Sequence, residues 1–451
     1  MLIELRFYSR PEHTSTRCRW LGTFLALSSV LAFLVVLNGC GTAYENTAIK
    51  SWGMMKSGEI DAALKNYEKN VTSNKDKLLK LMDEGILLRV AKRYEESNQK
   101  FFAAAKIIEL NGYLALGEQA VTLVTNEKQT TYQGEDFEKV LVHVYLGLNY
   151  LAMSDYENAI VETRKVNELL YMMISKAKRP YELNAFARYL NAMLFENEGE
   201  EDDAYIDYKN TVKIDPILTQ RFPIIHLDLL RLAKKLDFTA ELDAWKNQFG
   251  NAEWDQAQKT LKDHDGAVVL LYESGKSPRK FSSREYHQAE GKGGSAIEVM
   301  IPVSYYERRK TLISRVKMSV ANQSAETVVL NDIEKTAIQH LKDRMGRMIA
   351  KALLTAGVKA GIATGVGKAT HSTELGLLTG LALFLASEAD TRSWLLLPGG
   401  LQVAKIFLPP GRYDIDLSYQ DDYHNVISSD VVSGIEVKPG KATFIQKRSF
   451  D

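Results

Sequence analysis

The chain has 451 residues, which at roughly 100–200 residues per domain indicates two to four domains. Hydrophobic residues make up 45% of it and charged residues 25%, and these ordinary globular values exclude wholesale disorder. Lys+Arg and Asp+Glu both number 57, so the formal net charge is zero, which argues against binding of nucleic acid through bulk positive charge. The two cysteines, Cys18 and Cys40, both lie near the start, so the rest of the chain has neither a disulfide framework nor a cysteine-based metal site.

The first 39 residues have the features of a targeting segment. A positively charged stretch is followed by an uncharged apolar run from Trp20 to Leu37. The run ends in Leu37-Asn38-Gly39-Cys40, which resembles the lipobox of bacterial lipoproteins, and an uncleaved membrane anchor is the alternative. The resemblance implies a signal peptide over 1–39 and a mature chain with acyl groups on Cys40, which anchor stably because several chains are buried in lipid. Gly41, in place of the Asp that retains Gram-negative lipoproteins in the inner membrane, implies the outer membrane with the body in the periplasm.

A helical repeat is predicted over residues 40–250. Apolar residues there recur at helical spacing, and small residues recur at two fixed positions of an aligned pattern. The pattern resembles the tetratricopeptide repeat, in which small residues let two helices approach closely, and its first interval is 34 residues. We therefore expect a degenerate α-solenoid, with an irregular helical bundle as the alternative. The small residues are Ser51, Gly85, Gly147 and Ala192 at the first position, and Ala63, Ser97, Ala159 and Ala204 at the second.

The first helices of such an array line a concave groove that usually binds a peptide. The residues expected to face this groove are apolar rather than the Lys/Arg/Asn clamp that holds a peptide carboxylate. An open apolar groove would promote association, so either later segments of this chain or a hydrophobic partner peptide must cover it. The predicted partner-groove residues are Met82, Ile86, Val90, Val144, Leu148, Leu151, Phe186, Tyr189 and Met193.

Residues 251–331 form a linker followed by strands. The apolar run Gly266–Tyr272 predicts a buried strand, and the Gly-, Ser- and Lys-rich segment 274–295 predicts a long loop. Further strands are expected near 296–304, 312–321 and 325–330. Asn331 or Asp332 is expected to cap the helix that follows.

Residues 332–390 predict a glycine-rich helical hairpin. Glycines four residues apart give each helix a flat face that permits close helix packing. Lysines interrupt the first helix and the second uncharged run is short for a membrane span, so a buried hairpin, serving as a lid on the groove, is favoured over a membrane-spanning one. Interfacial contact and oligomer packing are the remaining alternatives. The predicted helix-packing residues are Gly357, Gly361, Gly365, Gly376 and Gly380.

Residues 391–451 predict a C-terminal β module. Strands are expected at 402–408 and 412–419, and a last hairpin is expected to pair 434–438 with 442–447. The Pro409-Pro410-Gly411 turn before an alternating strand resembles small β-sandwich modules of bacterial surface proteins. The predicted fold class is therefore α+β and multidomain: a tetratricopeptide-like α-solenoid, then an α+β region with the helical hairpin, then a β-sandwich-like tail.

No catalytic constellation is apparent. Gly275-Lys276-Ser277 follows a strand, yet Leu270 stands where a P-loop needs glycine and Pro278 blocks the helix that would hold phosphate. Asp263-His264-Asp265 are adjacent and cannot all converge on one metal ion. Arg308-Arg309-Lys310 is interpreted as a strand end facing solvent, with lipid headgroups or anionic glycan as the alternative contact. We expect no enzyme activity, no cofactor and no bound metal.

Taken whole, the chain resembles a little-characterised family of Gram-negative tetratricopeptide lipoproteins. The resemblance is carried by the lipobox, the repeats, the glycine-rich hairpin and the segment Asp390-Thr391-Arg392-Ser393-Trp394. It implies a non-enzymatic adaptor in cell-envelope assembly, with a protein partner in the envelope and the membrane contacted through the N-terminal lipid. The alternative is a glycan- or lipid-binding envelope protein that acts through the β module or the hairpin, and cosedimentation with peptidoglycan or anionic vesicles would distinguish the two.

Overall fold

The structure is a computed structural model in which two compact units are distinguished, Met1–Ala43 and Tyr44–Asp451. The elements described below belong to the second unit, apart from Ala43 at the start of the first helix. The residues that the structure describes are 43–111, 131–177, 184–215, 217–290, 296–346, 349 and 389–450.

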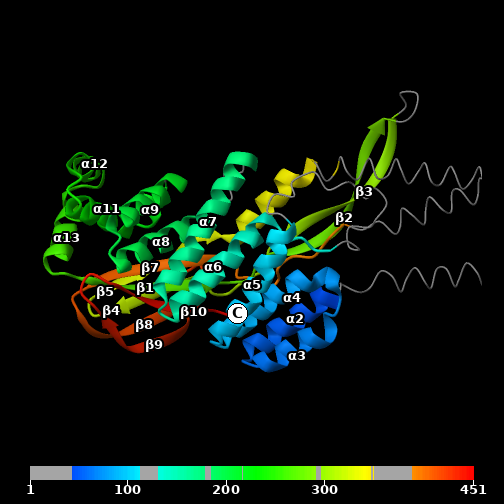
Figure 1. The fold of residues 1–451 in the computed structure, drawn as a ribbon, viewed down its shortest axis with the longest axis horizontal. Coiled ribbons are helices and arrows are strands. Elements are labelled where there is room, and N and C mark those ends of the chain that lie inside the picture. Colours follow the sequence, from blue (N-terminus) through cyan, green and yellow to red (C-terminus); the bar gives the residue numbers. More distant parts are fainter. Residues whose placement is uncertain are drawn as a thin grey trace, which may run out of the picture. The chain divides into compact units, whose positions relative to one another are not determined.

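The first half of the described chain consists of paired helices (Figure 1). Each pair joins a first helix to a second through a short turn, and neighbouring pairs pack side by side. The pairs are α2 (Ala43–Lys56) with α3 (Ile60–Asn70), α4 (Lys77–Val90) with α5 (Tyr94–Asn111), α6 (Asp136–Ala152) with α7 (Tyr156–Ala177), and α8 (Ala185–Glu198) with α9 (Glu201–Ile214). The shorter η1 (Asn74–Asp76) and α10 (Leu218–Arg221) lie between helices, and α11 (Ile224–Lys235), α12 (Thr239–Phe249) and α13 (Asn251–Lys262) follow the pairs.

Small residues allow the close approach within pairs, as the repeat alignment predicts. A Cβ atom added to Gly85 of α4 would lie 2.7 Å from the Phe101 ring of α5, too close for any real contact. A Cβ atom on Gly147 of α6 would lie 3.3 Å from Thr163 of α7. The helices of these two pairs are therefore in contact at the positions where the alignment places a small residue opposite a larger one.

The second half is mostly strands, which form two four-stranded sheets and one hairpin. The first sheet has the order β10-β1-β7-β6, the second has the order β5-β4-β8-β9, and β2 pairs with β3. Only β1 and β10 run parallel among these pairs. The strands are β1 (Gly266–Ser274), β2 (Arg279–Glu290), β3 (Ala296–Glu307), β4 (Arg315–Val320), β5 (Gln323–Glu326), β6 (Val328–Asp332), β7 (Gly400–Leu408), β8 (Gly411–Gln420), β9 (Val426–Val437) and β10 (Ala442–Arg448).

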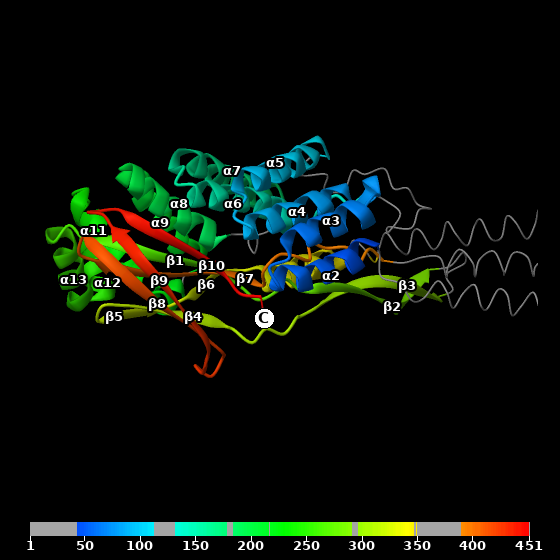
Figure 2. The ribbon, with the colours of Figure 1, turned by 90° about the horizontal axis from the view of Figure 1, so that it is seen from below.

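Strand β1 is buried on both faces and divides two hydrophobic cores. Its residues Ala267, Val269 and Leu271 belong to the core shared with the helices. The alternate residues Val268 and Leu270 belong to the core between the two sheets. The array, the first sheet and the second sheet therefore form three successive layers (Figure 2). Because β1 comes from the 251–331 segment and lies between β7 and β10 of the 391–451 segment, the two segments share one sheet.

Several local predictions can be compared with the strands. The expected loop over 274–295 is wrong, since 279–290 is strand β2. This strand pairs only with β3 among the described strands, so its polar residues need no apolar alternation and resemble a loop in the sequence. The expected hairpin of 434–438 with 442–447 is also wrong, because β10 pairs with β1 and β9 with β8. The predicted cap is confirmed: Asp332 Oδ1 accepts a hydrogen bond from the Lys335 amide at 2.7 Å, where helical residues 333–346 begin.

Candidate functional site

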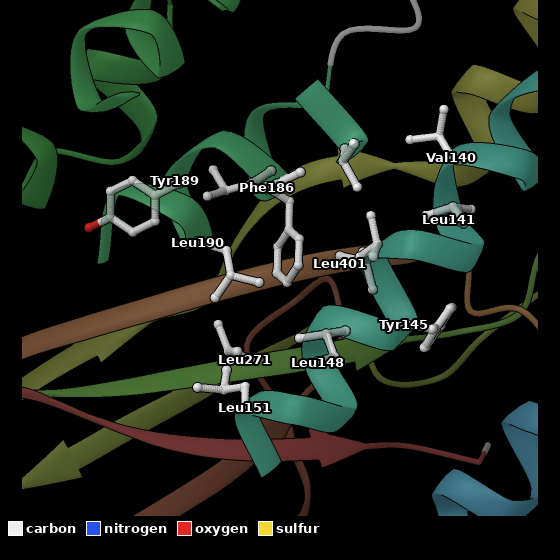
Figure 3. Close-up of a cluster of buried hydrophobic side chains, with 14 of the residues drawn as sticks. Val140, Leu141, Tyr145, Leu148, Leu151, Phe186, Tyr189, Leu190, Leu271 and Leu401 are labelled. Carbon is white, nitrogen blue, oxygen red and sulfur yellow. The ribbon is translucent and has the colours of Figure 1, made fainter. Parts of the chain in front are cut away.

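The predicted groove residues lie together in the core between the helices and the first sheet. Eight of the nine are buried, and Val90 is partly buried and packs against the same core. Figure 3 shows Leu148 and Leu151 of α6 and Phe186 of α8 directed toward Leu271 of β1 and Leu401 of β7. The concave side of the array is therefore in contact with strands of the same chain, which removes eight of these residues from solvent.

An irregular segment, residues 389–399, covers the part of the groove formed by α2, α4 and α6. Its central residue Trp394 has 1% of its surface exposed. The indole lies 6.1 Å from the Phe101 ring and 5.8 Å from the Tyr145 ring, measured between centroids. Leu395, Leu396 and Leu397 are also buried in this core. The groove thus holds a segment of the chain in the place where a tetratricopeptide array would hold a peptide.

Helix side chains bind the amide groups of this segment. The Trp394 amide donates to Glu138 Oε1 at 2.7 Å, and the Leu396 amide donates to Asp83 Oδ1 at 3.3 Å. The Leu395 amide donates to the Tyr44 hydroxyl at 3.3 Å. Three consecutive backbone donors are therefore satisfied by side chains of three different first helices, as in recognition of a bound peptide.

The carbonyl groups are bound by residues that follow β1 and β3 and by the last residue of β10. Ser277 Oγ donates to the Trp394 carbonyl at 3.0 Å, and the Ser277 amide donates to the Leu397 carbonyl at 2.9 Å. The Arg309 guanidinium donates to the Leu395 carbonyl at 2.7 Å, and that of Arg448 to the Leu396 carbonyl at 2.5 Å. The segment is therefore held on one side by the array and on the other by the strand region.

The two carboxyl groups that bind the segment are in a low-dielectric environment. Burial raises the pKa of Asp83 to about 7, although hydrogen bonds from the Tyr67 and Tyr44 hydroxyls and the Leu396 amide act in the opposite direction. Burial and the nearby charge of Glu135 also raise the pKa of Glu138. Both shifts favour the protonated form of the acid over the carboxylate.

A second cluster joins helical residues 333–346 to the start of α6. Lys280 Nζ lies 2.5 Å from Glu135 Oε1, and Arg344 also pairs with Glu135. His340, which is 1% exposed, has Nδ1 3.3 Å from Glu135 Oε2 and Nε2 3.5 Å from Asp136 Oδ2. Burial alone would raise the pKa of Glu135, but Lys280 and Arg344 hold it well below its usual range. The helix that leads into the glycine-rich segment is thus attached to the array by ionic contacts.

A third cluster joins β7 to α8 and α11. Lys405 Nζ lies 2.6 Å from Asp228 Oδ1, and both side chains are at most 1% exposed. The Tyr189 hydroxyl donates to Asp228 Oδ2 at 2.7 Å, and Arg231 pairs with Asp228 and with Glu196. Burial lowers the pKa of Lys405, while Asp228 and Glu196 oppose this effect. The charges here are paired, so they join the sheet to the array.

A fourth cluster centres on Glu273 of β1. Its Oε1 lies 3.2 Å from Arg89 of α4, and its Oε2 lies 3.3 Å from Arg448 of β10. The Tyr145 hydroxyl donates to Glu273 Oε2 at 3.1 Å. The array and the sheet are therefore joined at several points along the groove by polar contacts between residues far apart in the sequence.

These polar residues were not predicted from the sequence. The available signal was the presence of single carboxylates, such as Asp83 and Asp228, inside otherwise apolar helix faces. A lone charge at such a position requires a buried partner, although the sequence does not indicate which residue supplies it.

Several predicted sites lie outside the described residues. These are Cys40, the signal peptide over 1–39, and the five helix-packing glycines, Gly357, Gly361, Gly365, Gly376 and Gly380. The prediction that the hairpin forms the groove lid therefore stays a prediction, while residues 389–399 and the first sheet fill the described groove. Within the described ranges, no cluster of three or more His, Cys, Asp or Glu side chains is arranged to hold a metal ion. Helices in the same ranges include none with the length and apolar character needed to cross a membrane.

Comparisons with known proteins give matches only among solved structures. No family model and no curated protein matches the chain. MamA residues 41-end from Desulfovibrio magneticus RS-1 is 14% identical, and the match covers 50% of this chain and 98% of that one with a TM-score of 0.30. PilF of Pseudomonas aeruginosa is 19% identical over 48% of this chain and 82% of that one, with a TM-score of 0.30. RapI is 11% identical over 49% of this chain and 57% of that one, with a TM-score of 0.34.

Proposed function

We propose that the chain is a non-enzymatic scaffold of the bacterial cell envelope. The observation that carries the proposal is the helical array itself, whose groove binds residues 389–399 of the same chain through the backbone of that segment. A groove occupied in this way holds the array and the sheets in a fixed arrangement. Partner proteins then bind to surfaces outside the groove, where a rigid arrangement limits the entropic cost of association.

The second helices of the array provide such a surface. Large apolar side chains on them are exposed to solvent, among them Phe102 of α5 at 41%, Tyr171 of α7 at 71% and Ile206 of α9 at 53%. Single exposed apolar residues are common on proteins, but three on consecutive second helices give a partner several points of contact. The proposed partners are other proteins of the envelope.

The proposed location follows from the lipobox resemblance. Acyl chains on Cys40 would tether the protein to the outer membrane, and the body would face the periplasm. The adaptor would then connect a partner in the envelope with the membrane without catalysing a reaction.

The test is photocrosslinking in intact cells, with p-azidophenylalanine placed at one of two tyrosines. Tyr171 is exposed on a second helix, whereas Tyr145 is fully buried in the groove. The proposal predicts adducts with other envelope proteins from position 171 and none from position 145, because the groove is filled. Adducts from position 145 would show that the groove opens to partners. Absence of any adduct from exposed positions, together with no partner recovered from crosslinked envelopes, would refute the scaffold function.

A further inference from the structure

The helix of residues 333–346 is held to the array in two different ways. In its first half, Ile333 and Ala337 are at most 1% exposed and belong to the core shared with the helices of the array. In its second half, Leu341 is also buried, but it belongs to neither of the two cores. His340, which is 1% exposed, reaches the start of α6 from this second half through ion-pair contacts. Apolar packing therefore fixes the start of the helix, whereas its last turns are joined to the array by charge.

The imidazole of His340 lies between two carboxylates. Its Nδ1 is 3.3 Å from Glu135 Oε2, and its Nε2 is 3.5 Å from Asp136 Oδ2. An ionised carboxylate offers only acceptors, and a neutral imidazole carries a proton on only one of its two nitrogens. With a neutral ring, one nitrogen lone pair would therefore face a carboxylate oxygen. Only the doubly protonated ring can donate to both carboxylates, so the geometry selects the imidazolium form.

The two carboxylates have further cationic partners. Glu135 pairs with Arg344 of the same helix as the imidazole and with Lys280 of β2. Asp136 pairs with Lys139, one turn later on α6, at 3.1 Å. Neither lysine belongs to helix 333–346, so among these printed contacts only those of the imidazole and of Arg344 join this helix to α6. Further ionisable groups that border the carboxylates are Glu138, Tyr132 and Tyr306.

The electrostatics of the site agree with a proton held on the imidazole. Burial alone would lower the pKa of His340, but the hydrogen bonds to Asp136 and Glu135 outweigh this effect and raise it above its ordinary value, against the opposing charge of Arg344. The Phe137 ring packs edge-on against the imidazole, with 6.0 Å between centroids. Because the folded pKa is raised, the stabilisation is complete below about pH 6.5, the ordinary value for histidine, and is lost as pH rises through the folded pKa.

We propose that His340 is a proton-dependent latch: the doubly protonated ring attaches the last turns of helix 333–346 to α6, and loss of one proton releases them. Ile333 and Ala337 remain in the core in both states, so the change is confined to residues 340–346. The glycine-rich segment follows this helix in the sequence, so the latch determines whether the chain enters that segment from a fixed position. The latch goes beyond the proposed scaffold function and does not depend on it.

The test is hydrogen exchange measured by mass spectrometry on the full-length protein in nonionic detergent, between pH 6 and 9. Each rate is divided by the intrinsic exchange rate at that pH, and the amides of 340–346 are compared with those in the middle of α6. We expect the protection of 340–346 to fall by about tenfold as pH rises, because each unit by which the folded pKa is raised couples the proton to the attachment by a factor of ten. The middle of α6 should stay protected.

Substitutions at position 340 separate the charge from the packing. His340→Lys keeps a positive charge up to about pH 10 and should hold residues 340–346 in place through pH 9. His340→Gln is uncharged and should leave them weakly protected already at pH 6. Asp136→Asn removes one of the two facing carboxylates and should lower the midpoint of the change by about one pH unit. The control is His424→Gln, which replaces an exposed histidine in the turn between β8 and β9 and should leave the midpoint unchanged.

Four results would overturn the proposal. The first is protection of 340–346 that does not depend on pH in the unmodified chain, and the second is the same profile in His340→Gln and His340→Lys. The third is a midpoint that does not move in Asp136→Asn, which decides the matter if a substitution at position 340 prevents folding. The fourth is loss of protection in the middle of α6 at the same pH, since that would be unfolding of the whole layered unit rather than release of one helix end.

Discussion

The contact between Gly85 and Phe101 allows a quantitative test of helix packing in the array. Replacing Gly85 with Ala would place Cβ 2.7 Å from two atoms of the Phe101 ring. The ring cannot yield easily, because it is fully buried, stacks on Tyr145 at 5.7 Å between centroids and contacts Trp394. Overpacking of this kind costs about 1–3 kcal/mol, while the better helix propensity of Ala returns about 1 kcal/mol.

Gly53 of α2 provides the matched control. It also lies inside a helix, but a Cβ atom there would have nothing within 4 Å. Gly53→Ala should therefore gain up to about 1 kcal/mol from helix propensity alone. Because propensity contributes to both variants, the free energies of unfolding of Gly53→Ala and Gly85→Ala should differ by about 1–3 kcal/mol, with Gly85→Ala the less stable.

The assay is urea unfolding of the chain from residue 40 on, with Cys40→Ser to prevent lipidation. Far-UV circular dichroism reports the helices, and tryptophan fluorescence reports the surroundings of the indoles in the array and the segment, including the buried indole of Trp394. The two signals should change together if the array and the sheets unfold as one unit. Equal stability of Gly53→Ala and Gly85→Ala would refute the reasoning, since it would mean that the pair of helices can separate at no cost.

Three further predictions concern charge and anchoring. Because burial raises the pKa of Asp83 to about 7, the stabilisation from its protonated form is present at low pH and is lost as pH rises through 7. The free energy of unfolding measured in urea should therefore decline between pH 5 and 8, and Asp83→Asn should remove about 1–3 kcal/mol of that decline. An unchanged pH profile in the variant would contradict the shift. Lys405→Ala leaves the buried Asp228 with one cation fewer and should lower the free energy of unfolding by about 3–5 kcal/mol. Lys447→Ala breaks a partly exposed ion pair and should lower it by about 0–1 kcal/mol. Similar losses in the two variants would contradict the difference in burial between the two ion pairs. Cys40→Ser should abolish the acyl mass on the mature N-terminus and release the protein from the membrane fraction, and retention in that fraction would favour an uncleaved anchor.

The sequence predicted the features that depend on local spacing. The helix pairs, the small residues between them, the buried strand β1 and the Asp332 cap all follow from periodicity or from residues a few positions apart. The apolar groove residues also followed from periodicity, because the first helices of a repeat face one side. These signals are visible without knowledge of what the groove contacts.

The sequence did not predict the contacts that join distant segments. The parallel pairing of β10 with β1 replaced a hairpin that the local turn residues favoured, because β1 is buried on both faces and needs a neighbour at each edge. The ion pair between Lys405 and Asp228 links residues on β7 and α11, and no local pattern connects them. The contact of Arg309 with the Leu395 carbonyl was missed for the same reason, since the Arg308–Lys310 stretch alone resembles a solvated strand end.

The central claim is that the groove of the array is filled by residues 389–399, held through their backbone. Hydrogen exchange measured by mass spectrometry on the Cys40→Ser chain tests it most directly. The account predicts that the amides of Trp394, Leu395 and Leu396 are protected as strongly as those in the middle of α6, although 389–399 contains no regular secondary structure before Gly400. Exchange of these three amides at the rate of an exposed loop, with α6 still protected, would contradict it and show that the groove is open.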